Sequence, residues 1–162
     1  MNTLIGPDLT QTVTVTQYQT EGRGFALGDR VLSSGAEWVY VLASNSITAY
    51  DAVRIEQGYV ASQLTIDTGK DPAELGFAQF AFDDGEYGFV MVGGTPLIRL
   101  AADCDKNVAL YATSTGGVLD DATTSVKIQG VICTTSVTGA TTAATCVSRF
   151  PTLDRADTKA GA

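Results

Sequence analysis

Histidine is absent from this chain of 162 residues. Histidine is the commonest general base near neutral pH and the commonest transition-metal ligand, so its absence excludes Ser-His-Asp, Cys-His and zinc-hydrolase chemistry. We therefore expect a protein that is not an enzyme, with no catalytic residues, no cofactor and no bound metal. The alternative is an enzyme that works through paired carboxylates.

Basic residues are scarce as well. The chain has 10 Lys and Arg against 18 Asp and Glu, which gives a net charge of −8. Proteins that bind nucleic acid need a basic surface for the phosphate backbone, so nucleic acid is not an expected partner. No apolar run approaches the roughly 20 residues that cross a bilayer, and the start, MNTLIGPDLTQ, has neither a basic region nor an apolar stretch. We expect no membrane partner and no export signal.

Cysteine occurs only three times, at Cys104, Cys133 and Cys146. The number is odd, no two cysteines have C-x-x-C spacing, and no histidine can complete a zinc set. The pattern favours three reduced and largely buried thiols, with a disulfide as the alternative.

Threonine and β-branched or aromatic residues are plentiful, and they occur in short segments separated by Gly, Asp, Asn and Ser. Such segments predict strands and turns. The candidate strands are 12–16, 37–43, 52–56, 59–64, 75–82, 86–92, 96–100, 108–111, 125–134 and 143–149. One helical turn is expected in DPAEL, where Asp71 can cap and Pro72 can begin the helix. The fold class is therefore all-β, a small barrel or sandwich of short antiparallel strands.

The two halves of the β region resemble each other. In both, a strand ending in Leu-Ala precedes a polar turn, and matching glycines follow; the pairs are Leu42-Ala43 with Leu100-Ala101, Gly76 with Gly130, and Gly85 with Gly139. This order predicts two β half-units, about 38–94 and 95–151, that share one core.

Three regions follow from this division. Residues 1–24 are expected to form an extended N-terminal arm or an exchanged strand. Residues 25–151 form the β domain, and residues 152–162, which include the apolar-poor DRADTKAGA, form a flexible tail.

Acidic residues gather in three turns. Asp83-Asp84-Gly85-Glu86 lies between two strong strands, as hairpin turns do, and Asp103 and Asp105 flank Cys104. The third, STGGVLDDATTS, carries Asp120 and Asp121. No calcium-loop frame fits around Asp83 or Asp103. Each segment is interpreted as a turn, whose side chains can bond local backbone amides, with a divalent ion held by Asp103 and Asp105 as the alternative.

Exposed aromatic and β-branched residues are the candidate contacts. Aromatic residues cluster around one hairpin, and alternation would turn some of them outward as a sugar platform or a subunit contact. The arm alternates Thr and Val and could pair with a strand edge. The candidate protein–protein contacts are Thr12, Val13, Val15, Tyr18, Tyr87 and Phe89.

From about Leu27 to Pro151 the order of motifs resembles a family of capsid decoration, or cement, proteins of tailed bacteriophages. The resemblance lies in LGDRVLSSGAEWVYVLASNSITAYDAV, ELGFAQFAFDDGEYGFVMVGG, AADCDKNVALYATSTGGVLDDATTS and IQGVICTTSVTGATTAATC, followed by FP. The similarity is one of the order of strand and turn segments, and it includes no catalytic motif.

The resemblance implies a small virion structural protein, commonly a homotrimer, that is assembled in the host cytoplasm. Such a protein binds the outer capsid surface and stabilises it by bridging subunits of the major capsid protein. The alternative is a phage tail or fibre component, or a receptor- or carbohydrate-binding β module.

Overall fold

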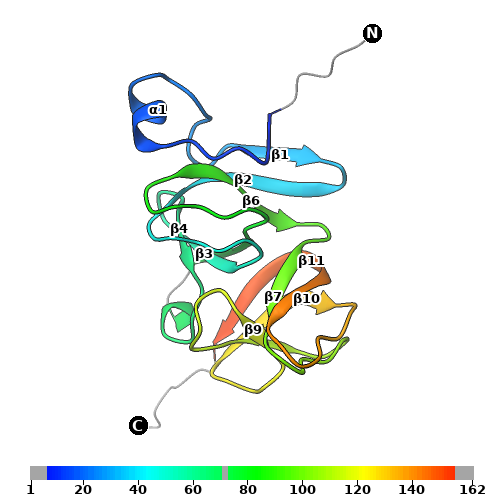
Figure 1. Cartoon of the computed structure of the whole chain (residues 1–162). Coiled ribbons are helices and arrows are strands. Elements are labelled where there is room, and N and C mark those ends of the chain that lie inside the picture. The colour runs from blue at the N-terminus through cyan, green and yellow to red at the C-terminus, as the bar shows by residue number, and fades with distance from the viewer. Residues whose placement is uncertain (1–6, 71–72, 156–162) are drawn as a thin grey trace.

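The computed structural model describes residues 7–70 and 73–155, and the chain forms two small closed β-barrels stacked end to end (Figure 1). The first barrel contains β2 (Ala36–Ala43), β3 (Ala52–Glu56), β4 (Val60–Gln63), β5 (Glu74–Phe77) and β6 (Tyr87–Gly93). The second contains β7 (Leu97–Leu100), β8 (Leu110–Ala112), β9 (Leu119–Asp120), β10 (Val126–Cys133) and β11 (Thr142–Arg155). The all-β prediction is confirmed.

Three further elements belong to the first half of the chain. Strand β1 (Arg30–Ser33) pairs with β2, α1 (Val15–Gln19) precedes it, and a 3₁₀ turn, η1 (Thr68–Lys70), precedes β5. No described helix is long and apolar enough to cross a membrane.

The two barrels have the same topology. In the first, β2 pairs with β4 in parallel and with β6 in antiparallel fashion, and β3 lies between β4 and β5. In the second, β7 pairs with β9 in parallel and with β11 in antiparallel fashion, and β8 lies between β9 and β10. Each strand of the second barrel thus repeats the pairing of the strand five places earlier, with β5–β6 matched by β10–β11.

Both barrels contain one parallel pair, so the expectation of antiparallel strands alone is wrong. The chain crosses over after each Leu-Ala strand end and returns alongside it, which places Val60 beside Leu42 and Leu119 beside Leu100. Closure of each sheet gives every described barrel strand a neighbour on both sides.

The apolar core has three clusters. One fills the first barrel and includes Val39, Val53 and Val90. The largest fills the second barrel and continues into the first through Ala52, Leu64, Leu75 and Phe77. The expected single core is therefore replaced by two barrel interiors, of which the second extends across the junction. The third cluster lies between the first barrel and the arm.

The prediction of a strand at 12–16 is wrong, because the helix α1 begins within this segment. Thr14 is the N-cap of α1, and its hydroxyl accepts a hydrogen bond from the Gln17 amide at 3.3 Å while the Gln17 side chain accepts one from the Thr14 amide at 3.0 Å. This reciprocal capping box outweighs the alternation of Thr and Val. Only Val13 keeps strand pairing, in a single antiparallel bridge to Tyr87.

Two boundary predictions are also wrong. Glu74 and Leu75 begin β5, so they are not in a helical turn, and the expected cap residues of that turn, Asp71 and Pro72, lie outside the described residues. At the other end, β11 continues to Arg155, and Thr152 pairs with Gln129. The first four residues of the expected tail are thus strand, and the others lie outside the described residues.

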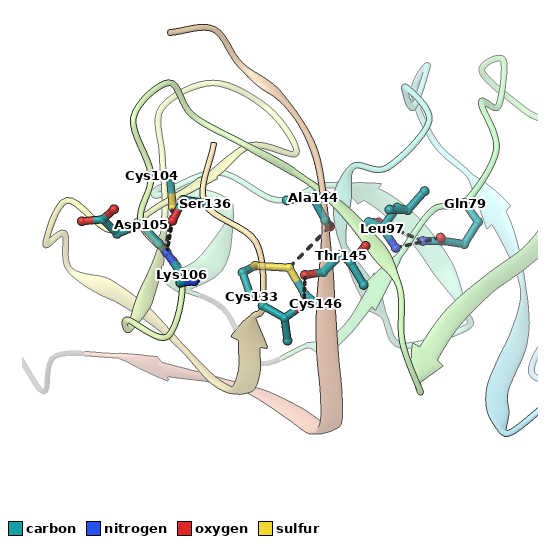
Figure 2. The surroundings of a disulfide bond; sticks show 11 residues. Gln79, Leu97, Cys104, Asp105, Lys106, Cys133, Ser136, Ala144, Thr145 and Cys146 are labelled. Atoms are coloured by element: carbon teal, nitrogen blue, oxygen red, sulfur yellow. Dashed lines mark hydrogen bonds between the residues drawn. A yellow bond between two sulfur atoms is a disulfide. The ribbon is translucent and has the colours of Figure 1, made fainter. Parts of the chain in front are cut away.

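The prediction of three free thiols is wrong for two of them. Cys133 and Cys146 are directly opposite in the β10–β11 hairpin, with their Cα atoms 3.9 Å apart, and they form a disulfide (Figure 2). Spacing in sequence does not reveal this pair because the hairpin register brings them together. Cys104 is the free cysteine of the three, and it is buried.

Candidate functional site

The two barrels meet at a buried carboxylate, Asp51, which follows the β2–β3 turn. Its Oδ1 lies 2.8 Å from Nη2 of Arg99, and its Oδ2 accepts hydrogen bonds from Nε2 of Gln63 at 2.6 Å and from the Thr48 amide at 2.9 Å. Burial raises the pKa of the Asp51 carboxyl, while these hydrogen bonds and the Arg99 guanidinium oppose that effect. Because Arg99 belongs to β7, the pair joins one barrel to the other.

The segment STGGVLDDATTS reaches this junction. The Gly117 amide donates to the Leu64 carbonyl at 2.9 Å, and the Gly117 carbonyl accepts from the Ala52 amide at 2.9 Å. Gly117 has a φ of +74°, and a Cβ there would overlap the Asp51 carboxyl group. Glycine is therefore needed at this position for the chain turn and for the close approach to Asp51.

A second polar link lies on another side of the junction. The Gln79 side chain accepts a hydrogen bond from the Leu97 amide at 3.0 Å and donates one to the Leu97 carbonyl at 3.1 Å (Figure 2). Together with the Asp51 contacts it fixes the start of β7 against the first barrel.

The side chains of the acidic segments accept backbone hydrogen bonds, one of them local and two from distant segments. The Asp83 amide donates to the Glu86 side chain at 2.9 Å, and Gly85 has a φ of +82°, as a turn requires. The Asp103 side chain accepts from the Gly139 amide at 2.9 Å, and the Asp121 side chain accepts from the Asp105 amide at 3.0 Å. The structure thus uses these carboxylates to hold turns.

Two of these acidic segments also bring together side chains of the kinds that bind metal ions. The Cys104 sulfur and one oxygen each of Asp120 and Asp121 lie within 4.8 Å of one another. Burial, with the nearby negative charges of Asp121 and Asp120, raises the pKa of the Cys104 thiol to about 11. The thiol is therefore protonated at neutral pH, and the thiolate form is the one that binds metals.

Three of the six predicted contact residues are buried within the chain. Val13, Tyr87 and Phe89 are all buried. The ring of Tyr18 in α1 stacks on that of Tyr87, with centroids 4.0 Å apart. Val13 exchanges backbone hydrogen bonds of 2.8 Å with Tyr87 in both directions. The described part of the arm covers the aromatic hairpin, so this hairpin is no exposed sugar platform.

The other two predicted contacts are more accessible. Val15 is exposed on α1, and Thr12 is half-buried. Beneath the arm lies a cavity of about 300 Å³ whose aromatic lining residues are Phe25, Tyr40 and Phe89. Asp8, Gln11 and Arg23 supply its polar side chains.

A hollow on the described surface lies between the β1–β2 hairpin and β11. This groove has a volume of about 440 Å³, and its lining includes Arg30, Leu32, Leu75, Arg149, Phe150 and Pro151. Leu32 is 83% exposed and Phe150 is 91% exposed, which makes them the two most exposed of the large apolar side chains that the structure describes. Both barrels contribute to the groove, so the junction described above determines its shape.

Backbone geometry holds Phe150 outward. Its φ is +48°, although it is not glycine and precedes Pro151, a position that favours extended backbone. Opposite it, the β10–β11 register shifts between Gln129 and Val131, and a Cβ at Gly130 would overlap the carbonyl oxygens of Arg149 and Phe150. A bulge of this kind re-aims a side chain. An exposed aromatic ring at a position of unfavourable backbone conformation makes this surface a candidate contact site.

Sequence reasoning misses this surface. The RFP segment has the pattern of a strand end, and SSG between two short apolar segments gives no hairpin prediction of its own. The one signal present is Gly130 in the middle of a strand pattern, which is typical of a bulge.

Comparison with known proteins does not identify a relative: no protein-family model matches the chain, and no curated protein matches it.

Proposed function

We propose that this protein is a non-enzymatic virion structural protein that decorates a bacteriophage capsid and bridges its major capsid subunits. The observation that carries the proposal is the groove between the barrels, with Leu32 and Phe150 exposed at its rim. An apolar hollow with projecting apolar side chains suits contact with another protein. The motif resemblance described above supplies the kind of partner.

The architecture supports the same function. Two closed barrels joined through Asp51, Arg99 and Gln79 form a stiff scaffold, and a protein on the outer surface of a capsid needs such stiffness. Many copies bound to a lattice add weak individual contacts through avidity, so a small groove is enough. In this proposal the protein assembles in the host cytoplasm and acts on the capsid surface as a homotrimer.

The direct test uses purified phage heads that lack the protein. We expect wild-type protein to co-sediment with the heads to saturation and to raise the temperature at which they release DNA. Leu32→Ser and Phe150→Ser remove exposed apolar contacts without disturbing either core, so they should fold normally and bind heads more weakly. Failure of the wild-type protein to bind such heads contradicts the proposal.

A carbohydrate-binding module is the second candidate, and the cavity beneath the arm favours it. Aromatic rings beside Asp8, Gln11 and Arg23 are a composition that binds sugars, and Phe25 at this cavity is partly exposed. Binding on a glycan array that Phe25→Ala abolishes would support this candidate. An array without any signal would exclude it for the glycans tested.

A further inference from the structure

Strand β1 has one edge that pairs with β2 and one edge without a strand neighbour among residues 7–70 and 73–155. The Tyr40 amide donates to the Asp29 carbonyl at 2.9 Å. Hydrogen-bonded pairs alternate along an antiparallel ladder, so Val31 and Ser33 bond to β2. Arg30 and Leu32 therefore direct their backbone N–H and C=O groups away from it.

This free edge borders the groove. Arg30 and Leu32 of β1 and Gly35 of the following turn line the groove together with residues 148–152 of β11. An extended chain beside β1 would thus have backbone groups to bond on one flank and apolar side chains below. Backbone groups at a sheet edge combined with side-chain pockets are the features that proteins use for β-strand addition.

The two arginines of the groove differ in their ion pairing. Arg30 is neutralised, because its Nη1 lies 2.8 Å from Glu37 and its Nη2 lies 2.7 Å from Glu74. Arg149 is exposed and has no ion-pair partner in the described part of the chain. The groove therefore offers one uncompensated cation next to the Phe150 ring.

We propose that the free edge of β1 and this groove bind an extended segment of a partner protein by β-strand addition. The segment has apolar side chains that cover Leu32 and Phe150 and a carboxylate that pairs with Arg149. The identity of the partner as a capsid subunit rests on the proposed function, whereas the binding mode does not.

A second copy of this chain fits the site less well. A symmetric contact would bring the same groove to both sides. The carboxylates of that groove, Glu37 and Glu74, already pair with Arg30, so no new partner for Arg149 would arrive.

The test measures binding of short fluorescein-labelled peptides by anisotropy. One peptide alternates valine and threonine around a central aspartate, a second has lysine at the centre, and a third has proline, which cannot complete the strand ladder. We expect the aspartate peptide to bind with a Kd below about 1 mM and the other two to bind at least about tenfold more weakly.

Variants then locate the site. Leu32→Ser and Phe150→Ser should each weaken binding of the aspartate peptide about tenfold, because each removes an exposed apolar side chain that the peptide would cover. Arg149→Glu should reverse the preference toward the lysine peptide. Val108→Ser, which changes an exposed valine of the second barrel outside the groove, is the matched control and should bind as wild type does.

The proposal is overturned if the aspartate peptide does not bind, if the proline peptide binds equally well, or if Leu32→Ser and Phe150→Ser leave binding unchanged. It is also overturned if light scattering shows a dimer that Phe150→Ser dissociates, since a second copy then occupies the groove. Binding of the peptide without binding to heads would contradict the proposed function and support strand addition at the groove. Binding to heads without binding of the peptide would support the proposed function and contradict strand addition.

Discussion

The two barrels share one topology but are reinforced in different ways. The first is covered by the arm, through the Val13 bridge to Tyr87 and the stacking of Tyr18. The second has a disulfide across its last hairpin and an extended β11. The shared order of strand pairing therefore determines the fold of both barrels. The segments that are not shared, the arm and the long β11, determine which surface of each barrel can contact another protein.

The glycines that precede the parallel strands give the sharpest comparison. Gly58 precedes β4 with a φ of +85°, and a Cβ added there would meet no atom within 4 Å, whereas Gly117 precedes β9 against Asp51. Gly58→Ala should lower the free energy of unfolding by about 1–2 kcal/mol through backbone strain alone. Gly117→Ala should lower it by about 3 kcal/mol or more, because overpacking adds to the strain.

Urea denaturation of the two variants measures this difference. Equal losses of stability would mean that the Asp51 contact contributes nothing and that the barrels differ only in their surfaces.

The disulfide should stabilise the second barrel alone. Its cysteines are 13 residues apart, and a loop of that size predicts about 3 kcal/mol of stabilisation. The double variant Cys133→Ser, Cys146→Ser should melt at a lower temperature than wild type. Reductant should lower the Tm of wild type toward that of the double variant, and it should leave the double variant unchanged. An identical Tm with and without reductant in both would contradict the role assigned to the bond.

The arm should stabilise the first barrel by a smaller amount. Tyr18→Ala removes the ring that stacks on Tyr87 and should cost about 1–2 kcal/mol. Hydrogen exchange should rise in β6 and stay unchanged in β10 and β11. Val15→Ala, on the exposed side of the same helix, is the control and should have almost no effect. Faster exchange in both barrels would show that the arm acts on the whole molecule.

The acidic turn of the second barrel should matter least. Asp120→Asn with Asp121→Asn should change the free energy of unfolding by less than about 1 kcal/mol, because asparagine oxygens can accept the same hydrogen bonds from the Asp121 and Asp105 amides. A large loss in the variant, together with stabilisation of wild type but not of the variant by an added divalent cation, would instead indicate an ion site.

The same double substitution should alter the stability at alkaline pH. The pKa of Cys104 is raised from 9.0 to about 11, so the folded state holds this proton more tightly than the unfolded chain does. The resulting stability is complete below about pH 9 and is lost as the pH rises through about 11. Removal of the two charges should shift this loss to lower pH, and Cys104→Ala should eliminate it. Urea denaturation between pH 8 and pH 11 measures both effects.

Much of the fold can be predicted from the sequence. Residues 52–56 have a strand pattern and form β3, and the repeated Leu-Ala, Gly76 and Gly130 pattern predicts the two half-units. Val118 and Leu119 follow a glycine turn, and Leu119 begins β9 as the turn chemistry indicates. These features depend on local conformational preferences, which a single sequence displays.

The surface is not predictable in the same way. Alternation turns Tyr87 and Phe89 outward in part, but the arm covers them, and that contact depends on the path of a distant segment. Phe150 is exposed because of a bulge opposite Gly130, and the Cys133–Cys146 bond depends on hairpin register. Long-range register of this kind decides which side chains reach the surface, and periodicity alone does not encode it.

Image reconstruction of phage heads decorated with this protein tests the central claim most directly. We expect density for two stacked barrels on the outer shell, at the boundaries between major capsid subunits, with the groove between β1 and β11 facing a segment of the shell. Barrel density confined to the tail or to fibres, or density on the shell with Leu32 and Phe150 facing solvent, would contradict it.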